Sequence, residues 1–293
     1  MHLRGVGALI HSRPDDGEPI SELTRTLVYF KWLCSFVDPV LLNQPSPYEQ
    51  KLWIELSPPI VYAVDKDSAS LRRSSHRLFI RLPRLIAAVR KLRNGDTDMA
   101  SYQEAVELAR DLLSLNDLDT ESALLHRVSI CKTAGVDSLV IPCSFQFPNC
   151  QSHEAALYFW TTRIILHRLA LQLCALNLPT FRPTSIFSSE LSAQNLRYAA
   201  NILIALHYAR TTGRMSTFRM FFPGLALWSV TCDCGVLLRN TATSLIRPMI
   251  LRAYHELVRK SYGPQTLCAE DLDEAAELLR GGPIVGLLVG MFT

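Results

Sequence analysis

Residues 152–176, SHEAALYFWTTRIILHRLALQLCAL, constrain the fold most strongly, because they form a helical pattern that is apolar on most of its faces. Ser152 stands just before the apolar run and is predicted to cap the helix, since a serine oxygen can accept from an unbonded N–H of the first turn. A helix that is apolar all round must be covered on several sides by other elements. The sequence therefore predicts a central, buried helix.

Most of the remaining chain shows the three- and four-residue spacing of apolar side chains that is typical of amphipathic helices. Helices are predicted for residues 68–93, where Pro83 should kink or split the helix, and for residues 119–135. Residues 136–150 lack this spacing and are predicted to be an extended connection, with one short strand as the alternative. We expect an all-α fold, with residues 1–293 forming a single compact domain of about ten to twelve helices.

Composition excludes some classes of protein. The formal net charge of +3 is too small to support nucleic-acid binding by bulk electrostatics. No stretch reaches the roughly 18 apolar residues of a membrane span, and the short apolar run after Arg4 does not fit a secretory leader. Eight cysteines in such a chain are expected to be reduced thiols. We expect a soluble protein of the cell interior.

The sequence lacks the motifs of common catalytic and metal sites. It contains no C-x-x-C or H-E-x-x-H pair, no G-x-S-x-G and no phosphate-binding glycine loop. Cys232 and Cys234 are closer together than the cysteines of a usual zinc site. Packing in or beside a helix is the main interpretation of this pair, and a redox or metal role is the alternative. The sequence thus predicts no metal site and no cofactor, and it favours a binding or regulatory domain over an enzyme.

Arginines are concentrated in the helix predicted at residues 68–93. Several recur at three- and four-residue intervals and therefore share one helix face: Arg73, Arg77, Arg81 and Arg84. Guanidinium forks bind carboxylates and phosphates, so this basic stripe is a candidate surface for an acidic partner. A solvated helix face is the alternative interpretation.

A line of polar residues interrupts the apolar central helix: Trp160, Arg163 and His167. Such a line can face an internal cavity and orient a hydrophobic small molecule with a few polar contacts. His207, on a later predicted helix, is a further candidate for the same site. Ordinary core packing around a satisfied arginine is the alternative.

Three blocks of sequence carry a resemblance to a known family. They are HLRGVGALIHSR at residues 2–13, FPNCQSHEAALYFWTTRIILHRLALQL at 147–173, and FPGLALWSVTCDCG at 222–235 with a following helix that contains AYHELVRKSYG. In this order they resemble the fungal-specific transcription factor domain, the regulatory helical region of zinc-cluster transcription factors. The resemblance spans nearly the whole chain.

The resemblance implies an all-helical regulatory region that acts in transcriptional control through partner contacts or small-molecule sensing, in a fungal pathway such as secondary metabolism. In that family a zinc cluster, a basic linker and a coiled coil precede this region. The sequence contains none of them, so direct sequence-specific DNA binding is not expected. The expected location is the nucleus, with the cytoplasm as the alternative. Expected partners are a protein or a hydrophobic small molecule, with a homodimer as a further option and no membrane.

Two other interpretations remain open from the sequence. One is a small-molecule enzyme of a fungal biosynthetic pathway, built on the same scaffold with a buried hydrophobic cavity. The other is a fragment of a regulator with no independent role. A cavity lined by the polar residues of the central helix would favour the enzyme, and their dispersal through a filled core would count against it.

Overall fold

The computed structural model describes residues 20–62, 64–95, 98–133, 138, 141–176, 185–211, 217–233, 241–262 and 268–284. Its helices are α2 (Glu22–Leu42), α3 (Lys51–Ile54), α4 (Lys66–Arg93), α5 (Met99–Ser114), α6 (Leu118–Leu125), α7 (Cys150–Ala175), α8 (Ser185–Thr211), α9 (Thr217–Asp233), α10 (Thr241–Tyr262) and α11 (Ala269–Leu279). A 3-10 turn, η1 (Ile60–Tyr62), and two strands, β1 (Ser129–Lys132) and β2 (Cys143–Gln146), complete the described elements. The predicted all-α, single-domain fold of about ten to twelve helices is confirmed.

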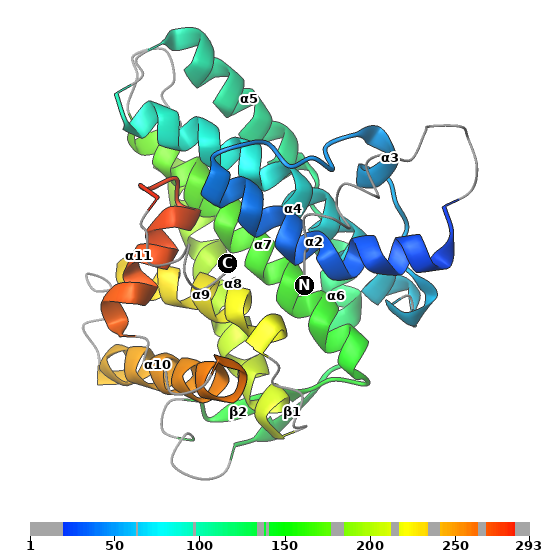
Figure 1. Ribbon diagram of the computed structural model, residues 1–293. Helices are drawn as coiled ribbons and strands as arrows, with labels where there is room; N and C mark the ends of the chain where they lie inside the picture. Colours follow the sequence, from blue (N-terminus) through cyan, green and yellow to red (C-terminus); the bar gives the residue numbers. More distant parts are fainter. Residues whose placement is uncertain are drawn as a thin grey trace.

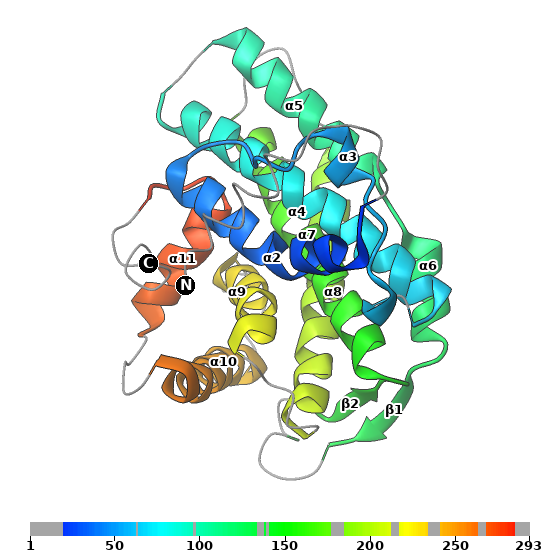
Figure 2. The ribbon, with the colours of Figure 1, turned by 45° about the vertical axis from the view of Figure 1, so that its right-hand side comes forward.

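Helix α7 runs through the middle of the molecule, and α4, α5, α8 and α9 pack around it (Figures 1 and 2). Its Phe159, Trp160 and Leu166 are completely buried. One continuous apolar cluster includes these side chains and residues from α2 to α11. The prediction of a central, buried helix is therefore confirmed. Helix α7 is apolar on most of its faces, and the neighbouring helices cover those faces.

The amino-terminal cap of α7 differs from the prediction. Asn149, and not Ser152, is the capping residue, and its side-chain oxygen accepts from the backbone N–H of Ser152 at 2.8 Å. The backbone of Asn149 is extended, as a capping residue requires, whereas Ser152 already lies in the first turn. The hydroxyl of Ser152 donates to the same Asn149 oxygen at 2.9 Å.

Helix α4 is not split at Pro83, because helical structure continues without a break to Arg93. A proline in a helix interior removes one backbone hydrogen bond and clashes with the preceding turn. Leu82 and Leu85, on either side of Pro83, are completely buried against the rest of the core. The apolar packing of these neighbours offsets the cost of the proline.

A small antiparallel hairpin lies where a longer helix was predicted. The helix expected at residues 119–135 ends at Leu125, and the chain then forms β1, which pairs with β2. The expected extended connection at residues 136–150 thus contains a strand, and Phe145 from that strand packs on Trp160 with ring centroids 6.3 Å apart. The first strand was missed because all of its residues are exposed, so that it shows no alternation of apolar and polar positions.

Some predicted features lie outside the described residues. These are the first block of the family resemblance, residues 2–13, and the pair formed by Cys232 and Cys234, for which no side-chain position is described. Within the described ranges, no helix combines the length and the apolar character that crossing a membrane requires.

Candidate functional site

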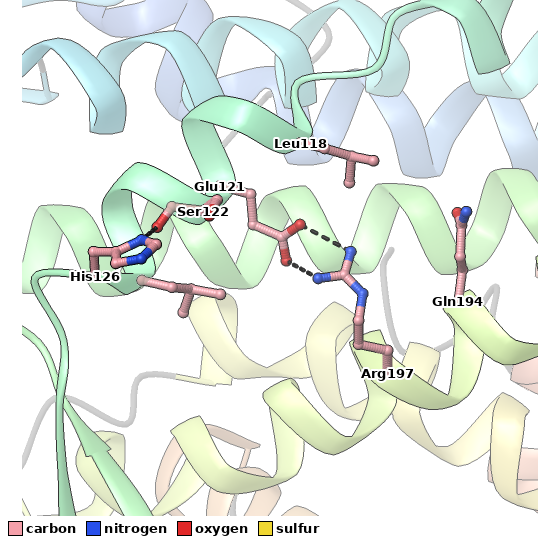
Figure 3. Close-up of a pocket in the computed structure, with 7 residues that line it drawn as sticks. Leu118, Glu121, Ser122, His126, Gln194 and Arg197 are labelled. Atoms are coloured by element: carbon pink, nitrogen blue, oxygen red, sulfur yellow. Dashed lines mark hydrogen bonds and ion pairs between the residues drawn. The ribbon is translucent and has the colours of Figure 1, made fainter.

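An open groove of about 500 Å³ lies between α6 and α8. The described residues that line this α6–α8 groove are Leu118, Glu121, Ser122, Leu125, His126, Gln194 and Arg197. Figure 3 shows their arrangement, with the α6 residues on one wall and the α8 residues on the other. Small-molecule sites in proteins usually have volumes of roughly 300–1,000 Å³ and combine apolar walls with a few polar groups. The groove has the volume of such a site, and two of its seven described lining residues, Leu118 and Leu125, are apolar.

Helical periodicity explains why these residues share a surface. On α6, Leu118, Glu121 and Leu125 are separated by three and four residues, so their side chains project from one face. On α8, Gln194 and Arg197 are three residues apart and share a face in the same way. Each wall of the groove is therefore one stripe of a helix.

An ion pair between Glu121 and Arg197 joins the two walls of the groove (Figure 3). The two terminal nitrogens of Arg197 donate to the two carboxylate oxygens of Glu121 at 3.1 and 2.9 Å. The indole N–H of Trp160 donates to the same carboxylate at 2.6 Å. Glu121 is only 2% exposed, so these three hydrogen bonds compensate the cost of burying its charge.

Arg197 is held on one edge and one face but reaches solvent. Its guanidinium carbon lies 4.4 Å above the ring centroid of Tyr198, and 43% of its side chain is exposed. Burial lowers the pKa of this guanidinium, but the hydrogen bonds and negative charge of Glu121 outweigh that effect and raise it overall. Arg197 is therefore a fixed cation at the open side of the groove.

His126 stands at one end of the groove (Figure 3). Its Nδ1 lies 2.7 Å from the backbone carbonyl oxygen of Ser122. A carbonyl oxygen only accepts hydrogen bonds, so Nδ1 carries a proton and donates it to this carbonyl. Among the described lining residues this histidine is thus engaged by the backbone and forms no nucleophile–base pair with a hydroxyl.

The three polar residues predicted on the central helix lie together, but they are enclosed in the core. Trp160 donates to Glu121, Arg163 donates to the backbone carbonyl of Leu115, and His167 packs against Tyr198 at 5.8 Å between ring centroids. All three are at most 2% exposed, and none of them lines the α6–α8 groove. Trp160 reaches the groove only through the carboxylate that it supports.

Burial and neighbouring arginines set the protonation of this enclosed cluster. Burial, reinforced by the charges of Arg163 and Arg197, lowers the pKa of His167 to about 3, although a hydrogen bond with Asn195 acts in the opposite direction. Burial also lowers the pKa of the Arg163 guanidinium, and the negative charges of Asp117 and Glu121 partly offset it. His167 is therefore neutral near pH 7 while Glu121 and Arg197 remain a charged pair.

His207 does not join the other predicted ligand residues. Helix α8 runs antiparallel to α7, with Tyr198 beside Phe159 and Tyr208 beside His153. The half-buried His207 neighbours Tyr208 and thus lies at the level of His153, about two helical turns from Trp160. The structure brings together three of the predicted residues and leaves the fourth elsewhere on α8.

The predicted basic stripe is largely engaged within the molecule. Arg81 forms an ion pair with Asp111 of α5, and Arg84 lies 3.5 Å from Glu49. Arg77 is half-buried and Arg73 is exposed. Intramolecular carboxylates thus use part of the charge that an acidic partner would need, and the stripe contributes to cross-helix contacts.

The groove residues were missed by sequence reasoning, and only weak signals could have found them. The three- and four-residue spacing on α6 and α8 is present, but it is common to all amphipathic helices. The contact between Glu121 and Arg197 joins residues 76 positions apart, and neither stands in a recognisable motif.

No metal site is evident in the part of the chain that the structure describes, because no three His, Cys, Asp or Glu side chains gather there as ligands. Comparisons of the chain with protein-family models, with curated proteins and with solved structures give no match. The resemblance to the fungal-specific transcription factor domain therefore stays a prediction from the sequence.

Proposed function

We propose that this chain is a regulator-like helical domain that acts in transcriptional control by sensing a small organic molecule in the α6–α8 groove. The observation that carries the proposal is the groove itself, with its volume of about 500 Å³, the two leucines of its α6 wall and the half-exposed Arg197 of its α8 wall. The role in transcription, the nuclear location and the link to secondary metabolism rest on the sequence resemblance alone.

The groove suits a sensor because a series of hydrogen bonds connects one of its lining residues to the buried central helix. Arg197 holds Glu121, Glu121 accepts from Trp160, and Trp160 is completely buried in α7. A molecule that binds Arg197 therefore contacts a group whose partners belong to α6 and to the central helix. A ligand shifts a conformational equilibrium only by contacts that differ between the two states, and this ion pair offers such a contact.

The enzyme alternative has less support from the described residues. It required a cavity lined by the polar residues of α7, whereas Trp160, Arg163 and His167 are enclosed by other side chains. Partner binding through the basic stripe also has less support, because Arg81 and Arg84 are in intramolecular ion pairs.

The experiment is a thermal-shift screen of small organic compounds against the 293-residue chain, repeated with two matched variants. Leu118→Ser changes the groove wall. Leu52→Ser is the control, because Leu52 of α3 is 38% exposed and Leu118 is 36% exposed. A ligand of the native state at a hundred times its Kd stabilises it by about 2.7 kcal/mol. We expect groove ligands to bind about ten times more weakly to Leu118→Ser and unchanged to Leu52→Ser.

Two results would contradict the proposed function. One is that no compound in a broad screen raises the melting temperature. The other is that the stabilising compounds respond equally to Leu118→Ser and Leu52→Ser, which would put their site outside the groove.

A further inference from the structure

Arg197 presents a fixed guanidinium to the groove, and a guanidinium is a common binding group for carboxylates. A guanidinium carries five N–H donors; the bidentate contact with Glu121 uses one on each terminal nitrogen, and the guanidinium also forms a side-chain hydrogen bond with Tyr198. The ion pair and the Tyr198 ring fix the plane of the guanidinium, while 43% of the side chain stays exposed. A planar, pre-oriented guanidinium binds a second carboxylate with two roughly parallel hydrogen bonds.

We infer that the α6–α8 groove binds an organic monocarboxylate, with the acid group on Arg197 and an apolar body along the leucine-bearing wall of α6. This inference deepens the proposed function and rests on it. Leu118 and Leu125 are seven residues apart on α6, which gives an apolar wall about 10 Å long. Gln194, one turn before Arg197 on α8, donates one amide hydrogen to Glu190 at 3.4 Å and carries a second amide hydrogen on the same nitrogen.

The charge of Glu121 does not exclude a ligand carboxylate. Glu121 is 2% exposed, and its oxygens already accept from Arg197 and from Trp160. The guanidinium of Arg163 lies close enough to interact electrostatically with both Glu121 and Asp117. Asp117 itself accepts from the hydroxyl of Ser70 on α4, at 2.8 Å. An incoming anion therefore meets the exposed cation first, with the neighbouring carboxylates compensated behind it.

The charges that line the groove favour one acid group over two. Arg197 is the one arginine or lysine among the described lining residues. A second carboxylate would find no second guanidinium or ammonium group there. A phosphate, which carries more charge, would need more than the one exposed cation among the described lining residues. The site chemistry thus selects a single carboxylate with a hydrocarbon body.

The test is a calorimetric titration of the full chain with acids and their matched primary amides: octanoate against octanamide, and phenylbutanoate against phenylbutanamide. Each pair has the same shape, so the ratio of the two Kd values isolates the charge. We expect the acids to bind about ten times more tightly, because charge-assisted hydrogen bonds are about twice as strong as neutral ones. Gln194→Ala, which changes the groove wall and removes one exposed hydrogen bond to Glu190, should weaken acid binding about threefold.

A double variant, Glu121→Gln with Arg197→Gln, replaces the ion pair by two amides that can still hydrogen-bond each other. The matched control, Asp111→Asn with Arg81→Gln, does the same to a cross-helix pair outside the groove. We expect the acid preference to disappear in the first variant and to persist in the second. If the first variant fails to fold, the wild-type ratio and the Gln194→Ala result decide the question.

The outcomes separate the inference from the proposed function. If acids and amides bind with equal affinity, and both lose affinity in Leu118→Ser, the inference is overturned and the groove remains a binding site. An acid preference that persists without Arg197, or that is untouched by Gln194→Ala, would also overturn it. A groove that binds neither series, nor any compound of the thermal-shift screen, would overturn both.

Discussion

Two ion pairs in this molecule have the same parts and different surroundings. Arg72 of α4 pairs with Glu154 of α7 and lies 4.9 Å above the Tyr158 ring, while Arg197 pairs with Glu121 and lies 4.4 Å above the Tyr198 ring. The side chain of Arg72 is 5% exposed, whereas that of Arg197 is 43% exposed.

The difference shows how burial decides what an ion pair can do. The sealed pair of Arg72 and Glu154 joins α4 to the central helix, and no surface reaches it, so its role is structural. The open pair of Glu121 and Arg197 buries only the carboxylate and presents the guanidinium to the α6–α8 groove. Arrangements that look alike in chemical terms thus have different functional potential, because a ligand can reach only one of them.

The largest expected effect comes from breaking the sealed pair. Glu154→Ala leaves the Arg72 guanidinium buried without its carboxylate, and the free energy of unfolding should fall by about 3–5 kcal/mol. Urea unfolding followed by circular dichroism measures this loss. Glu154→Gln, which keeps a hydrogen-bond acceptor, should lose less. A loss below about 1 kcal/mol for Glu154→Ala would show that water reaches Arg72 and that the pair is not sealed.

Breaking the open pair should cost less. Arg197→Ala leaves Glu121 with the Trp160 N–H and with water that can enter from the groove, so we expect a loss of about 1–3 kcal/mol in the same urea experiment. Arg247 serves as a control, since it is also stacked on an aromatic ring and paired with a half-exposed Asp273. Arg197→Ala should be more destabilising than Arg247→Ala. If the order is reversed, Glu121 is not held chiefly by Arg197.

Acid should destabilise the folded protein through His167, which is buried behind the open pair. The pKa of His167 is about 3 in the folded protein and about 6.5 in the unfolded chain, so below pH 6.5 the unfolded chain binds the proton first. Stability attributable to this group is complete above pH 6.5 and falls as the pH decreases towards 3, by about 1.4 kcal/mol per pH unit.

His167→Gln should reduce the pH dependence of the unfolding free energy between pH 6 and pH 4 by about 1.4 kcal/mol per pH unit, which corresponds to one proton. The measurement is urea unfolding at several pH values. Burial also lowers the pKa of His76, to about 4, so this histidine contributes a similar pH dependence. Because His76 is present in both the wild-type protein and the variant, its contribution cancels in the difference between them. An unchanged slope in the variant would mean that His167 takes up its proton in the folded state as easily as in the unfolded chain.

The smallest effect is expected for a pair whose carboxylate is open to solvent. Asp111 is 58% exposed and pairs across α4 and α5 with Arg81, which is 19% exposed. Such pairs contribute about 0.2–1 kcal/mol, so a double-mutant cycle of Asp111→Asn and Arg81→Gln should give a coupling in that range. The same cycle on Glu121 and Arg197 should give a larger coupling, and equal values would remove the distinction between the two pairs.

The sequence predicted the fold well where periodicity is unbroken. The long helices and the central position of α7 were predictable, since apolar spacing reports directly which faces are buried. The hairpin was not, because β1 is exposed on both faces and its pairing with β2 is a long-range event. The cap at Asn149 was misplaced by three residues, because Asn149 and Ser152 are both good capping residues and only the backbone conformation distinguishes them.

The candidate site was predicted only in part. Trp160, Arg163 and His167 were identified as a line of polar residues on an apolar helix, and they do form a cluster with groups from neighbouring helices. The sequence could not show that Glu121 would cap that cluster or that Arg197 would face solvent. Both facts depend on how α6 and α8 approach α7, which is a property of tertiary packing and not of any local pattern.

The position of α7 in the middle of the chain has a consequence for biosynthesis. The helices that cover it come from both sides: α4 and α5 are synthesised before it, and α8 and α9 after it. When the ribosome has released residues as far as 176, this helix, most of whose residues are buried in the folded protein, has half of its covering. That exposed flank persists until α9 emerges, so the nascent chain needs protection over some fifty further residues and is vulnerable to aggregation if translation stops early.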